Sequence, residues 1–378
     1  GDNTTADNNT AVGYLALNAN TTGTANTALG VEALKSNTTA SYNTALGRHA
    51  LYLNTTGAGL TAVGHQALNS NTTGNDNIAI GGYSTSSSIY AALYANTTGS
   101  SNVGIGVGAL RSNTTASNNT AVGKSALLAN TTGDQNTAVG SLAADALTTG
   151  AQNVAVGDAA LSTATTGIGN TAIGRAALNE NTGSSNTAVG QDALEANTSG
   201  GTNTAVGAQA LTANTTANNN TAVGYLALYA NTTGDLNVAI GSNALDANTV
   251  GDRSVAIGHG ALNQQNPASK GDMNNTAVGL NAGAGVTTGT RNTLLGSEAG
   301  DGITTGVKNT IIGYATEASA NNADSQIVLG YATYGHGDNK FTFGTSNGAS
   351  RVYNSYTVNA SWTRVSDERY KEEIQNNT

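Results

Sequence analysis

The sequence predicts an all-β repeat protein, a β-solenoid or β-roll built from 17-residue coils. Three observations support this: a short motif returns at a fixed spacing, its residues favour strands and turns, and the composition suits a narrow stacked coil. Of 378 residues, 49 are glycine, one is proline and none is cysteine. Only 10% are charged, against about 25% in an average domain. Too few large apolar residues remain for several globular cores.

The repeated motif is Asn-Thr-Ala-Val-Gly, with small variations, and it occurs nineteen times. Of the eighteen intervals between its final glycines, fifteen equal the step from Gly13 to Gly30, and three differ from it. A disordered low-complexity chain has no need of fixed spacing, so the regular register argues for stacked structure. The glycines stand at positions 13, 30, 47, 64, 81, 106, 123, 140, 157, 174, 190, 207, 224, 241, 258, 279, 296, 313 and 330.

Each repeat contains strand and turn signals in a set order, as residues 26–42 illustrate. Thr-Ala-Val alternates its faces and carries β-branched residues, which favours a strand. A second extended piece is expected around Ala-Leu. Glycine and Asn-Thr-Thr-Gly supply turns, and the abundance of Gly, Asn and Thr disfavours helices. The prediction is two short strands and two turns per coil.

Stacking of the coils places like residues above like residues, in ladders. Two ladders are aliphatic, one is alanine on the strand face opposite the first, and one is asparagine, whose amides stack as in cross-β structures. The first members are Val12, Leu29, Leu46, Val63 and Ile80; Leu17, Leu34, Leu51 and Leu68; Ala11, Ala28, Ala45 and Ala62; and Asn20, Asn37, Asn54 and Asn71.

The apolar content of one coil is small, and both faces of its Thr-Ala-Val strand carry apolar side chains. One face can line the interior of the coil while the other meets a second copy of the chain. We therefore expect a homo-oligomer in which the alanine ladder allows close approach at the axis.

Two longer intervals predict loops that leave the regular coil, because insertions in solenoids occur in loops. One holds residues 84–91, and the other holds Gln264, Gln265, Pro267 and Lys270. Tolerated surface insertions explain both, and contact loops are the alternative.

The character of the chain changes after Gly330. Both phenylalanines lie here, and residues 340–344 and 351–358 alternate like strands. Residues 362–378 carry seven charges, and Ser366 is suited to cap a helix with acidic residues in its first turn. The expected division is a repeat shaft (1–335), an aromatic β cap (336–365) and the start of a helical segment (366–378).

Residues 366–374, Ser-Asp-Glu-Arg-Tyr-Lys-Glu-Glu-Ile, resemble the opening of the endosialidase-type (peptidase S74) intramolecular chaperone domain of phage tail spikes and fibres. The resemblance implies a trimer, assisted folding of the preceding fibre, and self-cleavage between Val365 and Ser366 by a Ser366–Lys371 dyad. The upstream repeats are similar to shafts that precede such domains, and more loosely to the head repeats of trimeric autotransporter adhesins. The sequence continues only to Thr378, and a nucleophile needs a positioned base. In these residues alone we expect a helix cap and a solvated lysine.

Other chemistry is not indicated. A net charge of −9 excludes a broad nucleic-acid surface, and no apolar run is long enough for membrane insertion. His49 and His65 are near neighbours across coils, but we expect no carboxylate in step with them and no metal site. Phosphate-binding loops and recurrent carboxylate pairs are lacking in the sequence, so neither a cofactor nor an enzyme acting on other molecules is expected.

The function these features favour is a structural fibre, a viral tail fibre or shaft, located outside the cell or on the virion surface. Its expected partners are its own copies in a homotrimer and a host-surface glycan or protein. Two alternatives stay open: a bacterial surface adhesin or extracellular filament, and an ice-binding protein using the threonine ladder of Thr21, Thr38, Thr55 and Thr72.

Overall fold

The chain folds as an all-β solenoid with one coil for each sequence repeat in the computed structural model, which describes residues 5–84, 90–346, 350–357 and 363–365. It forms two compact units, Gly1–Gly200 and Gly201–Thr378. The predicted coil is confirmed in both units, and no residue of the described ranges is helical.

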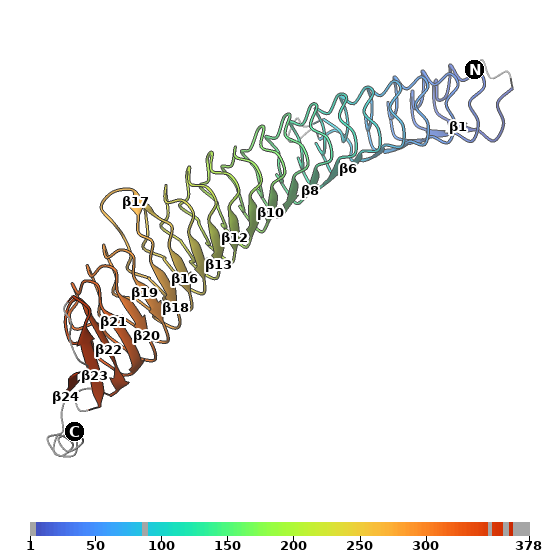
Figure 1. The fold of residues 1–378 in the computed structure, drawn as a ribbon. Helices are drawn as coiled ribbons and strands as arrows, with labels where there is room; N and C mark the ends of the chain where they lie inside the picture. Colours follow the sequence, from blue (N-terminus) through green and yellow to red (C-terminus); the bar gives the residue numbers. More distant parts are fainter. Residues whose placement is uncertain (1–4, 85–89, 347–349, 358–362, 366–378) are drawn as a thin grey trace, which may run out of the picture. The chain divides into compact units, whose positions relative to one another are not determined.

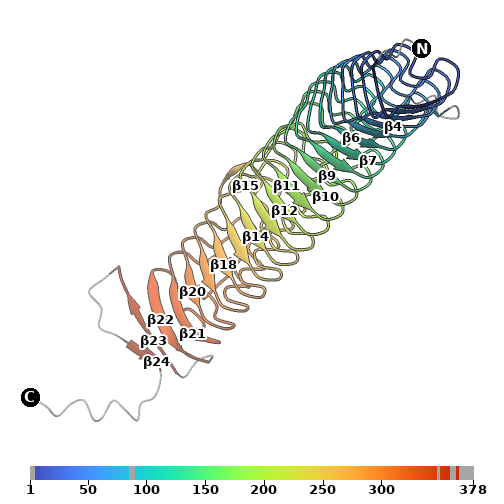
Figure 2. The ribbon, with the colours of Figure 1, turned by 90° about the vertical axis from the view of Figure 1, so that its right-hand side faces the viewer.

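In the first unit each coil contributes one three-residue strand, and consecutive strands pair in parallel, so that Ala28 lies opposite Ala45. The strands lie side by side along one face of the unit (Figures 1 and 2). They are β1 (Thr10–Val12), β2 (Thr27–Leu29), β3 (Thr44–Leu46), β4 (Thr61–Val63), β5 (Ile78–Ile80), β6 (Val103–Ile105), β7 (Thr120–Val122), β8 (Thr137–Val139), β9 (Val154–Val156), β10 (Thr171–Ile173) and β11 (Thr187–Val189).

The second unit is built from coils of the same type, followed by strands of a different arrangement. Its solenoid strands are β12 (Thr204–Val206), β13 (Thr221–Val223), β14 (Val238–Ile240), β16 (Val255–Ile257), β18 (Thr276–Val278), β19 (Thr293–Leu295), β20 (Thr310–Ile312) and β21 (Ile327–Tyr331). A separate short pair, β15 (Gly251–Asp252) and β17 (Gly271–Asp272), lies beside them. The C-terminal strands are β22 (Lys340–Thr345), β23 (Arg351–Ser355) and β24 (Thr363–Val365).

The second strand expected around Ala-Leu is wrong, because this part of the coil is a turn. The leucine lies in the left-handed region, with φ of 49° at Leu34 and 52° at Leu51. Its backbone is still paired across coils: the Leu34 N–H donates to the Ala50 carbonyl at 3.0 Å. The left-handed residue turns the chain sharply while the leucine side chain points inward, where Leu34 and Leu51 are fully buried.

The interior of each coil is lined by the alanine ladder and the leucine ladder together. Ala28 and Ala45 are fully buried within the single chain, whereas Leu29 and Val12 on the opposite strand face are 45% and 55% exposed. The expectation that the alanine ladder lines an oligomer axis is therefore wrong. A coil with one strand is narrow, so the small residue faces inward and the larger one faces outward.

Interior volume is conserved where the pattern changes. In residues 292–308 the inward strand position holds Leu294 in place of alanine, and the usual leucine position holds Gly300. A Cβ atom on Gly300 would lie 2.7 Å from a Leu294 methyl carbon, so the larger residue occupies the space that the glycine leaves. Close packing explains this exchange, because a core tolerates redistribution of a constant volume.

The asparagine ladder is confirmed, and its amides are bonded from coil to coil. The Asn54 Nδ2 donates to Asn37 Oδ1 at 3.0 Å, and the Asn71 Nδ2 donates to Asn54 Oδ1 at 2.8 Å. A second asparagine ladder, at the start of the motif, was not predicted. There Asn26 Oδ1 accepts the Asn43 backbone N–H at 3.0 Å, and Asn43 Nδ2 donates to the Gly57 carbonyl at 3.0 Å.

Of the two expected insertions, most of the first (residues 85–89) lies outside the described residues. The second insertion begins with a residue that is part of the regular coil and ends as a loop. Gln265 is fully buried and takes an asparagine position, where its Nε2 donates to Asn248 Oδ1 at 3.3 Å. Lys270 reaches back along the unit and pairs with Asp235 at 2.6 Å.

After β21 the parallel stacking gives way to a hairpin-like arrangement. Strand β22 still pairs in parallel with β21, but β23 pairs antiparallel with β22, and β24 antiparallel with β23. The strands expected over 340–344 and 351–358 are confirmed, the second ending at Ser355. The helix expected from Ser366 lies outside the described residues.

Candidate functional site

The predicted dyad, Ser366 and Lys371, lies outside the described residues. Val365, the residue before the predicted cleavage point, is the last residue of β24. The dyad therefore stays a prediction.

Side chains with distinctive chemistry concentrate at one place in the coil, which we call the variable corner. It comprises positions 6, 7 and 10 of each coil, counted from the asparagine that opens the motif. In residues 43–59 these positions hold Arg48, His49 and Tyr52. The neighbouring positions 8 and 9 hold the buried Ala50 and Leu51, so the framework fixes the corner while its outward side chains vary.

One carboxylate does align with a histidine at this corner, contrary to the expectation from sequence. Glu32 stands one coil before His49, and its Oε2 lies 2.8 Å from His49 Nε2. The same carboxylate pairs with Lys35 at 2.8 Å. The hydrogen bond from Lys35 holds the pKa of Glu32 below its ordinary value, with a smaller contribution from His49. Two ligands of this kind do not form a metal site, and no described cluster of three or more His, Asp or Glu could hold a metal ion.

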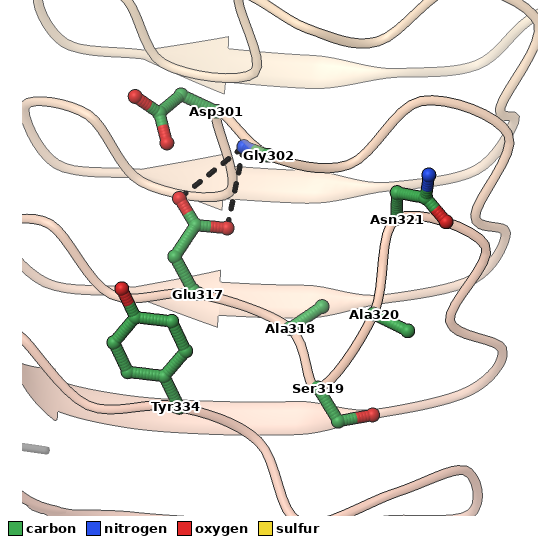
Figure 3. A pocket seen from close by; sticks show the side chains of 8 residues that line it. All are labelled: Asp301, Gly302, Glu317, Ala318, Ser319, Ala320, Asn321 and Tyr334. Atoms are coloured by element: carbon green, nitrogen blue, oxygen red, sulfur yellow. Dashed lines mark hydrogen bonds between the residues drawn. The ribbon is translucent and has the colours of Figure 1, made fainter.

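The second unit contains a small polar pocket around a pair of carboxyl groups, which was not expected from the sequence (Figure 3). The cavity measures about 330 Å³, and its polar lining includes Asp301, Glu317, Asn321 and Tyr334. Asp301 and Glu317 stand nearly one coil apart in the sequence, and that spacing is the signal that could have revealed the pair. Both Glu317 carboxylate oxygens accept the Gly302 N–H at 3.3 Å.

The Glu317 carboxyl group is largely buried beside Asp301, and both conditions favour its protonated form. Burial, together with the hydrogen bond to Asp301 and the charge of that residue, raises the pKa of Glu317 to about 8.

The outward side of the strands forms a regular surface in the first unit, which we call the outer face. It consists of the first and third residues of each strand from β1 to β11, a threonine, valine or isoleucine followed by an aliphatic residue. Leu46, Ile80, Val139 and Ile173 are between 37% and 41% exposed. In β4, β6, β7, β9 and β11 the third residue is half-buried. Large exposed apolar patches are typical of interaction sites.

No protein-family model and no curated protein sequence matches the chain. The resemblance of residues 366–374 to a tail-spike chaperone domain therefore stays a prediction. The described residues include no helix long and apolar enough to cross a membrane.

Proposed function

We propose that the protein is a structural fibre shaft, in which three parallel copies associate through their outer faces. The observation that carries the proposal is the aliphatic column of the outer face, which repeats at every coil of the first unit and is exposed or half-buried in each. An isolated chain leaves this column in water, whereas association buries it and gains about 25 cal/mol per Å² of apolar surface.

The coil suits a spanning role because its bonding is directed along the stack. Backbone pairs and side-chain amides join each coil to the next, and about 4.8 Å of length is added per coil. Stability in such repeats comes mainly from each repeat and its immediate neighbours. A unit of this type grows in length without needing a larger core.

The assignment to a particular kind of fibre rests on the resemblance of residues 366–374 to a tail-spike chaperone domain. By that resemblance we propose a viral tail fibre, extracellular or on the virion surface, that presents binding surfaces to a host-cell glycan or protein. The trimeric state is part of the same proposal.

Sedimentation velocity of the full chain tests the association. We expect a trimer, and we expect Leu29→Asp combined with Leu46→Asp to dissociate it, because an unpaired carboxylate in an apolar contact costs several kcal/mol. Leu53→Asp is the matched control, since Leu53 is equally exposed but lies away from the outer face. A folded wild-type monomer, or dissociation by the control alone, refutes the proposal.

One observation favours ice binding as a second candidate. Thr27 and Thr44 expose their side chains on the outer face beside Leu29 and Leu46, in a periodic array of hydroxyl and methyl groups. The threonines first considered for this role are engaged within the fold: the Thr38 hydroxyl donates to the Thr55 carbonyl at 3.1 Å. Both candidates use the same face, so only one can hold.

Thermal hysteresis separates the two. An ice-binding protein is expected to be monomeric and to depress the freezing point of its solution, and Thr44→Leu is expected to reduce that effect. A trimer without thermal hysteresis excludes this candidate.

A further inference from the structure

Six aromatic rings form a continuous row along the variable corner of the first unit. We call this set the aromatic row. Phe, Trp and Tyr together make up only 4% of the chain and there are four histidines, so a row of four tyrosines and two histidines is unusual. The centroids of successive rings are between 4.6 and 6.3 Å apart. In order of contact, the members are Tyr52, His49, His65, Tyr83, Tyr90 and Tyr94.

The row stands on the rigid part of the fold. Leu51, Leu68 and Leu93, on the same coils, are fully buried. The rings themselves stay partly exposed, and Tyr90 is 41% exposed. Other coils fold without them: residues 153–169 hold Asp158, alanine and serine at the variable corner and keep the same strand and buried leucine. The rings are therefore not required by the coil.

A cation lies over a ring near each end of the row. The Lys35 Nζ is 5.2 Å from the Tyr52 ring centroid, and the Arg111 guanidinium is 5.9 Å from that of Tyr90. Between residues 32 and 124 the sequence holds four Lys or Arg and two acidic residues, which gives this segment a net charge of +2 in a chain of net charge −9. One of the two acidic residues, Glu32, pairs with Lys35. The row is locally basic within an acidic protein.

One ring of the row, the His65 imidazole, is shifted toward its neutral form. Burial lowers the pKa of His65, and the charges of Arg48 and His49 lower it further. At the far end the row opens on a cavity of about 330 Å³ lined by Tyr90, Tyr94 and Arg111.

We propose that the aromatic row binds a linear anionic polysaccharide, with sugar rings against Tyr52, Tyr83 and Tyr94 and acidic groups at Lys35 and Arg111. The C–H bonds on a sugar face carry partial positive charge, and an aromatic face is negative, so the two attract. Carboxylate or sulfate groups complement the cations. We infer a linear polysaccharide because the aromatic row runs along successive coils. This inference deepens the proposed host-binding role and rests on it.

Single-stranded nucleic acid is the competing ligand, because aromatic stacking and cations also bind it. The observations favour the polysaccharide. Phosphate-backbone binding depends on neutralising many successive charges, and the row offers a cation near each end while the chain is acidic.

The test measures binding of the full chain to immobilised polygalacturonate, hyaluronate and chondroitin sulfate, with neutral dextran and a single-stranded oligothymidylate alongside. We expect at least one anionic glycan to bind more tightly than dextran and the oligonucleotide, and added salt to weaken it. Tyr52→Ala combined with Tyr94→Ala is expected to lower the affinity by about tenfold or more, as for aromatic anchors in other interfaces.

The matched control is Tyr225→Ala combined with Tyr229→Ala, since these exposed tyrosines occupy variable-corner positions of a coil in the second unit. The control should bind as the wild type does, and Arg111→Gln should weaken binding and flatten its salt dependence. Thermal unfolding of each variant confirms that the coil is intact.

Three results overturn the inference: no binding to any anionic glycan, equal binding to dextran or tighter binding to the oligonucleotide, or equal losses in both tyrosine pairs. Sedimentation of the same samples separates the two proposals. A trimer that binds no glycan refutes the aromatic row as a binding site but agrees with the fibre shaft. A monomer that binds glycan refutes the trimeric shaft but agrees with the binding site.

Discussion

Asn54→Ala tests whether the asparagine ladder holds the coils together. The Asn54 side chain is fully buried and makes three hydrogen bonds. Its Nδ2 donates to Asn37 Oδ1 at 3.0 Å and to the Gly57 carbonyl at 2.9 Å, and its Oδ1 accepts from Asn71 Nδ2 at 2.8 Å. Alanine removes all three.

The expected loss of stability depends on which hydrogen bonds the three former partners of Asn54 retain. Gly57 still accepts from Asn43, and Asn71 still donates to Gly74, so each of these loses only one of two bonds. Asn37 Oδ1 is left inside the coil without the amide that it accepts. A buried group left unpaired costs about 1–3 kcal/mol, and each bond lost between satisfied groups about 1 kcal/mol. The expected loss is about 3–5 kcal/mol.

Urea unfolding measured by circular dichroism gives the free energy of unfolding, and hydrogen exchange shows whether the loss centres on the affected coil. Thr56→Ala is the control in the same turn, since Thr56 is exposed, and a change within about 0.5 kcal/mol is expected there. A loss below about 1 kcal/mol for Asn54→Ala, or equal losses in both variants, refutes a stabilising role for the ladder.

A natural interruption of the ladder agrees with this role. Leu147 occupies the ladder position one coil after Asn130, and Asn130 Oδ1 is a buried atom without a hydrogen-bond partner. The leucine is itself fully buried, so apolar packing offsets the missing amide at that coil.

Three further outcomes are expected. Leu127→Ala should lower the free energy of unfolding by about 2–5 kcal/mol through the cavity it leaves, and a loss under about 1 kcal/mol in urea titrations contradicts the close-packed interior. Gly30→Ala should prevent or strain stacking, since Gly30 has φ of +139° and a Cβ atom would lie 2.6 Å from the Gly47 carbonyl oxygen; normal folding by circular dichroism refutes this. The pKa of Glu317 is raised from 4.5 in the unfolded chain to about 8 in the folded protein, so stability should fall as pH rises between these values. Glu317→Gln should flatten that slope in urea titrations, and an unchanged slope contradicts the raised pKa of Glu317.

The repeat predicted the coil, its length and its buried leucine and asparagine ladders, because these depend on spacing alone. The second strand could not be predicted correctly. Ala-Leu has the alternation of a strand, but Leu34 and Leu51 adopt a left-handed backbone that costs about 1–2 kcal/mol per residue. Burial of the leucine and the bonds between coils offset this cost, and both arise only after stacking.

The alternation pattern also could not predict which face of the strand points into the coil. A period of two separates Ala28 from Leu29 but does not say which side is inside, and the narrow coil decides that. The carboxyl pair escaped notice because Asp301 and Glu317 are not repeated elsewhere in step. The pairing of Glu32 with His49 was missed although the two residues are one coil apart. The dyad at Ser366 and Lys371 stays a prediction.

The two asparagine ladders have a consequence for how such a protein changes over generations. Each coil of the first unit offers its neighbour the same donors and acceptors, so removing residues 26–42 would let residues 9–25 meet residues 43–59 with equivalent bonds. Loss or duplication of one repeat alters length by about 4.8 Å and leaves the core chemistry intact. Near-identical repeats in a gene promote such events by recombination. The length of the solenoid can therefore change by one coil at a time without changes to the residues of its interior.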